Sequence, residues 1–110
     1  MLSIEKVKLE DLTEICPNYF YIKYEDNGKT GYNFLWCSFD VHNNITLVDP
    51  MDLTKVLTSL AYKVKDNSTF AGVAKGLNLP SSVIEEAKLM DKALCDAVFD
   101  KRKLNGKYKR

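Results

Sequence analysis

The feature that most restricts the fold of this chain is the segment Asp26-Asn27-Gly28-Lys29, which separates two stretches rich in aromatic and β-branched residues. Asn-Gly readily takes the two positive-φ conformations of a type I′ turn, whose twist matches that of the flanking strands. Residues 19–25 and 30–41 are therefore predicted to form a β-hairpin. A second turn at His42-Asn43-Asn44 leads to residues 45–48, so the simplest interpretation is a three-stranded antiparallel meander.

The two-residue turn also fixes the pairing register, and the alternation of side chains along a strand then sorts them between two faces of the sheet. One face is predicted to carry Phe20, Ile22, Leu35 and Cys37. The opposite face, termed here the aromatic face, is predicted to carry Tyr19, Tyr21, Tyr32, Phe34 and Trp36.

The aromatic face has three interpretations. Burial beneath the chain's own helices would make it ordinary core, but both faces of the sheet are apolar and a small α+β domain usually covers one of them. Contact with a protein partner or with a second copy is at least as well supported for the second face. Stacking of nucleic-acid bases would need basic residues between the aromatic rings, and this face offers only Lys23.

Patterns typical of helices flank the meander. Before it, Leu12 and Ile15 lie three residues apart with acids in the first turn, which predicts a short helix over residues 9–15 that stops at Pro17. After it, Asp49 as a cap and Pro50 at the first helical position predict a helix that reaches about residue 65.

Two further helices are predicted in the last third of the chain. Ser68 can cap a short helix that Asn78 closes. Residues 82–104 contain neither Gly nor Pro, which predicts a last helix of about 20 residues that ends at Asn105-Gly106. The apolar positions of the helices predict much of the core, namely Leu57, Leu60, Val64, Val73, Leu77, Val83, Ala87, Met90 and Leu94.

These elements predict an α+β fold, in which the three-stranded antiparallel meander is followed by a helical C-terminal half of three helices. A length of 110 residues suits one domain, so we expect a single domain over residues 1–104 and a basic tail over residues 105–110. The formal net charge of +1 hides an asymmetry. Residues 101–110 hold six basic groups and no acid, whereas the first hundred residues hold ten basic and fifteen acidic groups.

Residues 70–87 resemble the helix-turn-helix motif of DNA-binding proteins. Small Ala74 permits close helix contact and Asn78 suits the tight turn, although Gly is common at that position. The contacts that this resemblance implies at the start of the last helix are Ser81, Ser82 and Lys88. Glu85 and Glu86 oppose DNA binding, because two carboxylates would face a groove flanked by phosphates.

The basic C-terminal residues offer a sequence-independent clamp for phosphates. The candidate contacts are Lys101, Arg102, Lys103, Lys107, Lys109 and Arg110. Cations also stabilise the C-terminus of a helix through its macrodipole, which is the plainer interpretation of the same residues. A nucleic-acid-binding regulator with a basic tail is therefore the alternative function.

The sequence holds no pattern typical of a catalytic or metal site, so we expect no enzyme activity, metal, cofactor or small-molecule substrate. His42 is the only histidine, and no Cys, Asp or Glu lies near it at the spacing of metal ligands. A Cys37 and His42 dyad would span about 16 Å along one strand. Neither a Gly-rich phosphate loop after a strand nor a GxSxG elbow occurs.

The composition predicts the cellular setting, because it disfavours both membrane insertion and secretion. No apolar run approaches the roughly 20 residues that span a bilayer, and acids interrupt the N-terminal segment where a signal peptide is apolar. Three widely spaced cysteines do not suit a disulfide framework. We expect an intracellular, cytoplasmic protein with no membrane contact, and its small size and its richness in Lys, Asn and Tyr would suit a phage or mobile-element protein.

The leading hypothesis is a small, non-enzymatic regulatory or inhibitory protein that binds a protein partner or forms a homodimer. The aromatic face is one candidate surface. The other is the side of the last helix that lies outside its main apolar stripe, with Ile84, Leu89, Cys95 and Phe99.

Overall fold

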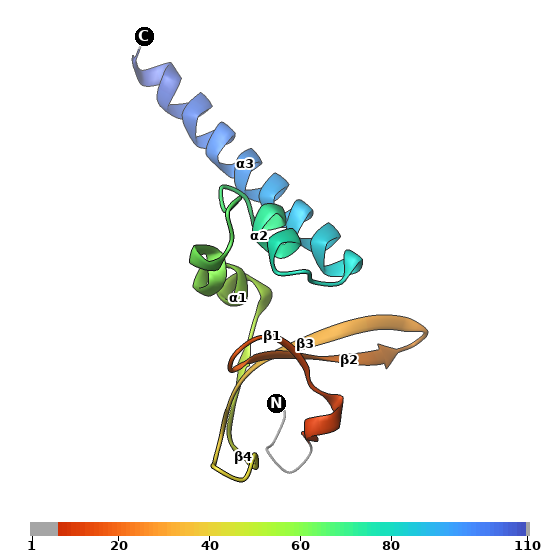
Figure 1. Ribbon diagram of the computed structural model, residues 1–110. Helices are drawn as coiled ribbons and strands as arrows, with labels where there is room; N and C mark the ends of the chain where they lie inside the picture. The colour runs from red at the N-terminus through yellow and green to blue at the C-terminus, as the bar shows by residue number, and fades with distance from the viewer. Residues whose placement is uncertain (1–6, 110) are drawn as a thin grey trace. The chain divides into compact units, whose positions relative to one another are not determined.

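Figure 1 shows the computed structural model of the protein, which describes residues 7–109, with the helix backbone alone over residues 99–109. The chain divides into two compact units, residues 1–59 and residues 60–110. In the described part of the chain, no helix combines the length and the apolar character that crossing a membrane requires.

The first unit is a four-stranded antiparallel sheet in the order β1-β2-β3-β4. Its strands are β1 (Thr13–Cys16), β2 (Tyr19–Asp26), β3 (Lys29–Phe39) and β4 (Ile45–Met51), and a 3₁₀ helix at Leu9–Asp11 precedes them. The second unit follows α1 (Leu53–Leu60) and contains a 3₁₀ helix (Ala61–Lys63), α2 (Phe70–Gly76) and α3 (Ser81–Lys109). The α+β class, the antiparallel sheet and the three α-helices are thus confirmed.

The β2–β3 hairpin forms as predicted. Asn27 and Gly28 have φ values of 51° and 79°, the positive-φ pair that a type I′ turn requires. The register pairs Tyr19 with Trp36 and Phe20 with Leu35, so the predicted division of side chains between two faces is correct. On the face opposite the aromatic one, a core cluster forms from Val7, Phe20, Leu35 and Cys37, with Leu12, Ile22, Phe39, Ile45 and Val48 packed against it.

The prediction of three strands was wrong, because residues 9–15 do not form a helix. The 3₁₀ helix ends at Asp11, and β1 then pairs with β2 through Thr13 opposite Tyr21. The chain reverses at Asn18, which has a φ of 76° and donates from Nδ2 to the carbonyl oxygen of Cys37 at 2.8 Å. A helix of seven residues is weak by itself, whereas pairing along the open edge of a hairpin satisfies the backbone groups of the same residues.

The predicted start of the first helix was also wrong. Asp49 and Pro50 lie within β4, which is an edge strand where the missing amide of proline is tolerated. The helix begins at Leu53 instead, and its cap is Asp52, whose Oδ1 accepts from the backbone amide of Lys55 at 2.7 Å. The α-helix ends at Leu60 and continues only as the 3₁₀ turn, short of the predicted residue 65.

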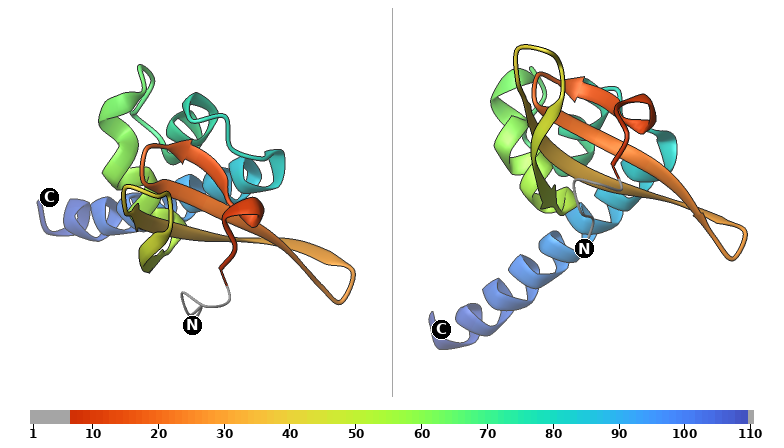
Figure 2. Two further views of the ribbon diagram at one scale, coloured as in Figure 1. Left: turned by 60° about the horizontal axis from the view of Figure 1, so that its bottom comes forward. Right: turned by 90° about the horizontal axis from the view of Figure 1, so that it is seen from below.

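The second unit is built on α2 and α3, which lie side by side in Figures 1 and 2. Thr69, not the predicted Ser68, caps α2, and its hydroxyl accepts from the amide of Gly72. Asn78 closes the turn with a φ of 58°, as predicted. The predicted helix end at Asn105-Gly106 was wrong, since α3 continues to Lys109.

Candidate protein-binding surface

The five residues of the aromatic face lie on one side of the sheet, as predicted, but their side chains are largely covered. The ring of Tyr21 contacts those of Tyr32 and Phe34, with centroids 5.5 and 6.2 Å apart. Phe34 is 7% exposed. The other members are half-buried, namely Tyr19, Tyr21, Tyr32 and Trp36.

The strand next to the hairpin adds an acid to this face, because Asp49 of β4 pairs with Trp36 of β3. A carboxylate beside the rings disfavours the stacking of nucleic-acid bases, whose phosphates it would repel. The exposed aromatic side chain of the β2–β3 hairpin is Tyr24, at 43%, which lies on the opposite face across from Gly31. The aromatic face therefore offers less free surface than its composition predicts.

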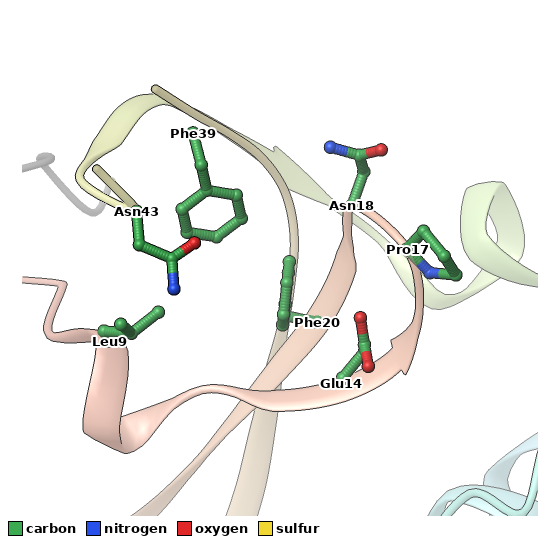
Figure 3. Close-up of a pocket in the computed structure, with 7 residues that line it drawn as sticks. All are labelled: Leu9, Glu14, Pro17, Asn18, Phe20, Phe39 and Asn43. Atoms are coloured by element: carbon green, nitrogen blue, oxygen red, sulfur yellow. The ribbon is translucent and has the colours of Figure 1, made fainter. Parts of the chain in front are cut away.

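A pocket of about 390 Å³ lies at the other face of the same sheet (Figure 3). It is lined by Leu9, Glu14, Pro17, Asn18, Phe20, Phe39 and Asn43. Phe20 and Phe39 meet edge to face, with ring centroids 5.6 Å apart. Among the described residues of the lining, Glu14 is the only titratable group and it is exposed, so these residues offer no paired or buried acid–base groups of the kind that a catalytic site uses.

The two residues of the conceivable Cys37 and His42 dyad lie in different surroundings. Cys37 is fully buried, and burial raises the pKa of its thiol, which makes it a poor nucleophile. His42 is exposed in the β3–β4 turn, where its backbone amide donates to Oδ1 of Asp40 at 2.9 Å. Within the described residues, no three His, Cys, Asp or Glu side chains are grouped to hold a metal ion.

Asp91 joins the two helices of the second unit. Its carboxylate oxygens accept from the backbone amides of Phe70 and Ala71, at 2.7 and 2.9 Å, and so cap the N-terminus of α2 from the side of α3. Because Asp91 lies ten residues beyond the start of α3, α2 must fold back along α3. The pair is thus an αα-hairpin joined by a tight turn.

The DNA contacts that the helix-turn-helix resemblance implies lie on α3 of this hairpin. Ser81 and Ser82 are exposed at the start of α3. Lys88 is exposed too, but its Nζ lies 2.8 Å from Oε2 of Glu85, so a carboxylate accompanies the cation on the same surface. The side chains of the basic group lie outside the described residues, namely Lys101, Arg102, Lys103, Lys107, Lys109 and Arg110.

A free apolar surface of the second unit begins where α2 ends. Val83 and Ala87 are buried on α3, at 4% and 0% exposure. The same helical stripe continues about two and three turns further on to Leu94 and Val98, which are 55% and 43% exposed. The prediction that Leu94 belongs to the core was therefore wrong, because α2 has only seven residues and does not extend that far along α3.

We term Leu94, Ala97 and Val98 the α3 stripe. Every side chain from Lys92 to Val98 is exposed, so these two turns of helix gain little packing from the described part of the chain. Leu89, another exposed leucine at 67%, lies about 140° around the helix from Leu94 and outside the stripe. Of the helix residues named from the sequence, Cys95 is exposed, Ile84 is half-buried and the side chain of Phe99 lies outside the described residues.

Comparison with known proteins gives no family for this chain: no family model, no curated protein and no solved structure matches it. A function for this chain is therefore inferred from the geometry of its own surfaces.

Proposed function

We propose that the protein acts by binding another protein through the α3 stripe. The observation that carries the proposal is the exposure of Leu94 and Val98 on the continuation of a stripe that is buried about two turns earlier, at Ala87. Exposed apolar side chains aligned along a regular helix are typical of helix-in-groove and helix-pair recognition. Binding of this kind suits a non-enzymatic regulatory or inhibitory protein.

The length of α3 supports the same proposal. Its 29 residues extend about 43 Å, whereas the seven residues of α2 cover about 10 Å. Helices in water owe most of their stability to packing of an apolar face, so a segment exposed on all sides gains little from its own chain. A bound protein would supply the missing packing.

Site-specific photo-crosslinking in the cells that express the chain tests this proposal. A photoreactive phenylalanine analogue replaces Leu94 in one variant and Leu89 in a matched control, since both are exposed leucines of α3 on different sides of the helix. We expect a protein adduct of defined mass from position 94 and none from position 89. Equal adducts at both positions, or none at position 94, would contradict the proposal.

A further inference from the structure

The pocket of the first unit combines a carboxylate with two aromatic rings. Glu14 of β1 pairs directly with Phe20 of β2, so their side chains leave the sheet next to each other on one face. Phe20 in turn meets Phe39 of β3 edge to face, with ring centroids 5.6 Å apart. Figure 3 shows these three side chains at the same pocket. The pocket thus offers a negative charge and aromatic surface to one ligand.

The segments that form the pocket are acidic. Residues 7–18 and 39–45 carry four carboxylates and one lysine, a net charge of −3 with His42 neutral. Among the described residues, no basic side chain lines the pocket and none forms an ion pair with Glu14. A site with this charge attracts cations and repels phosphates and carboxylates. The ligand that complements the pocket is therefore a cation.

The other lining residues select the kind of cation. A metal ion would need several oxygen or nitrogen ligands, and no three His, Cys, Asp or Glu side chains of the described residues are grouped to supply them. Four described residues of the lining are instead apolar, namely Leu9, Pro17, Phe20 and Phe39. Aromatic faces attract ammonium groups, and apolar walls cover the carbons that such groups carry. The volume of about 390 Å³ has room for an ammonium head and several carbon atoms.

We propose that this pocket binds an organic ammonium cation, a positively charged nitrogen with alkyl groups such as choline or a methylated lysine side chain carries. The Glu14 carboxylate balances the charge, and the rings of Phe20 and Phe39 contact the alkyl groups. Phe20 belongs to the core cluster and Phe39 packs against it, so both rings are held in place before a ligand binds. Asn18 already donates from Nδ2 to the carbonyl oxygen of Cys37, which leaves its side-chain oxygen as a further acceptor.

An NMR titration of the isotope-labelled full chain at constant ionic strength tests the pocket. Choline is compared with its neutral isostere, in which a carbon atom replaces the charged nitrogen. We expect choline to shift the amides of Glu14, Phe20 and Phe39 saturably and to bind at least about fivefold more tightly than the isostere. Glu14→Gln should weaken choline binding by about threefold or more and leave the isostere unaffected, because it removes the charge and keeps the shape. Glu25→Gln removes the same charge near the other end of β2 and should change neither affinity.

A peptide with one trimethyllysine among neutral residues separates the two sources of the cation. Tighter binding of this peptide than of choline would identify a protein side chain as the ligand, and equal or weaker binding would identify a free ammonium compound. Equal affinities for choline and its isostere, no saturable shift with choline, or equal effects of Glu14→Gln and Glu25→Gln would overturn the inference. The pocket lies in the first unit and the α3 stripe in the second, so none of these results decides the proposed function.

Discussion

At the scale of single residues, Asp91 has the clearest structural task. It is half-buried and accepts two backbone hydrogen bonds at the N-terminus of α2. Asp91→Ala should lower the free energy of unfolding by about 1–3 kcal/mol, because two backbone amides lose a charged acceptor. Asp96→Ala is the matched control, since Asp96 bonds only to exposed Lys92, and we expect little change. Urea unfolding followed by circular dichroism measures both, and equal losses would contradict the assigned role.

The cysteines give a second test at this scale. Burial raises the pKa of Cys37, whereas Cys95 is exposed on α3. Alkylation proceeds through the thiolate, so Cys95 should react with iodoacetamide well before Cys37 in the folded protein, and the two should react alike in denaturant. Peptide mapping by mass spectrometry after timed labelling measures this order. Equal native rates would show that Cys37 is not in the core of the sheet.

At the scale of elements, the β3–β4 turn is organised by one carboxylate. Asp40 accepts from the backbone amides of Asn44 and His42, both at 2.9 Å, and the hydrogen bond from Asn44 is the main reason that its pKa is lowered. A lowered pKa in the folded state means that the ionised group stabilises the turn above the ordinary value of 3.8. That stabilisation should be lost as the pH falls through the folded pKa.

An NMR titration of the His42 and Asn44 amides measures this loss. We expect both resonances to shift with one common midpoint below pH 3.8. Asp40→Asn should remove that common midpoint, because the amide does not ionise over this range. Independent midpoints, or an unchanged titration in the variant, would contradict the role of Asp40.

The elements also show what local sequence can predict. The β2–β3 hairpin was predictable because Asn27-Gly28 determines its own turn and, through it, the register of every pair. The strand β1 was not, because its state depends on an edge of the sheet that only tertiary pairing provides. Asp49-Pro50 illustrates the same limit, since a good helix-start signal is overridden by pairing of β4 with β3.

The candidate surface was predictable only in part. The periodicity of α3 places Leu94 on the same stripe as Val83 and Ala87, but no pattern within α3 tells where α2 stops covering that stripe. Asp91 was missed for a related reason, because its partners lie twenty and twenty-one residues away. The available signal was the position of Asp91, an acid at the edge of the otherwise apolar stripe of α3.

At the scale of the whole molecule, α3 divides into a first part that α2 covers and a second part that it leaves uncovered. The segment that bears Asp91 and packs on α2 is stabilised within the chain, whereas the segment from Lys92 onward is exposed on all sides over its described side chains. The central claim is that this second segment is stabilised by contact with protein.

Hydrogen exchange measured by mass spectrometry, on the isolated protein and on the protein recovered with its partner from the cells that express it, tests that claim most directly. The account predicts that amides of residues 92–109 exchange more slowly in the recovered complex than in the isolated protein, while those of residues 83–91 stay unchanged because α2 already packs there. Leu94→Glu should abolish this protection and Leu89→Glu should retain it. Exchange over residues 92–109 that is the same with and without the partner, and in both variants, would contradict the account.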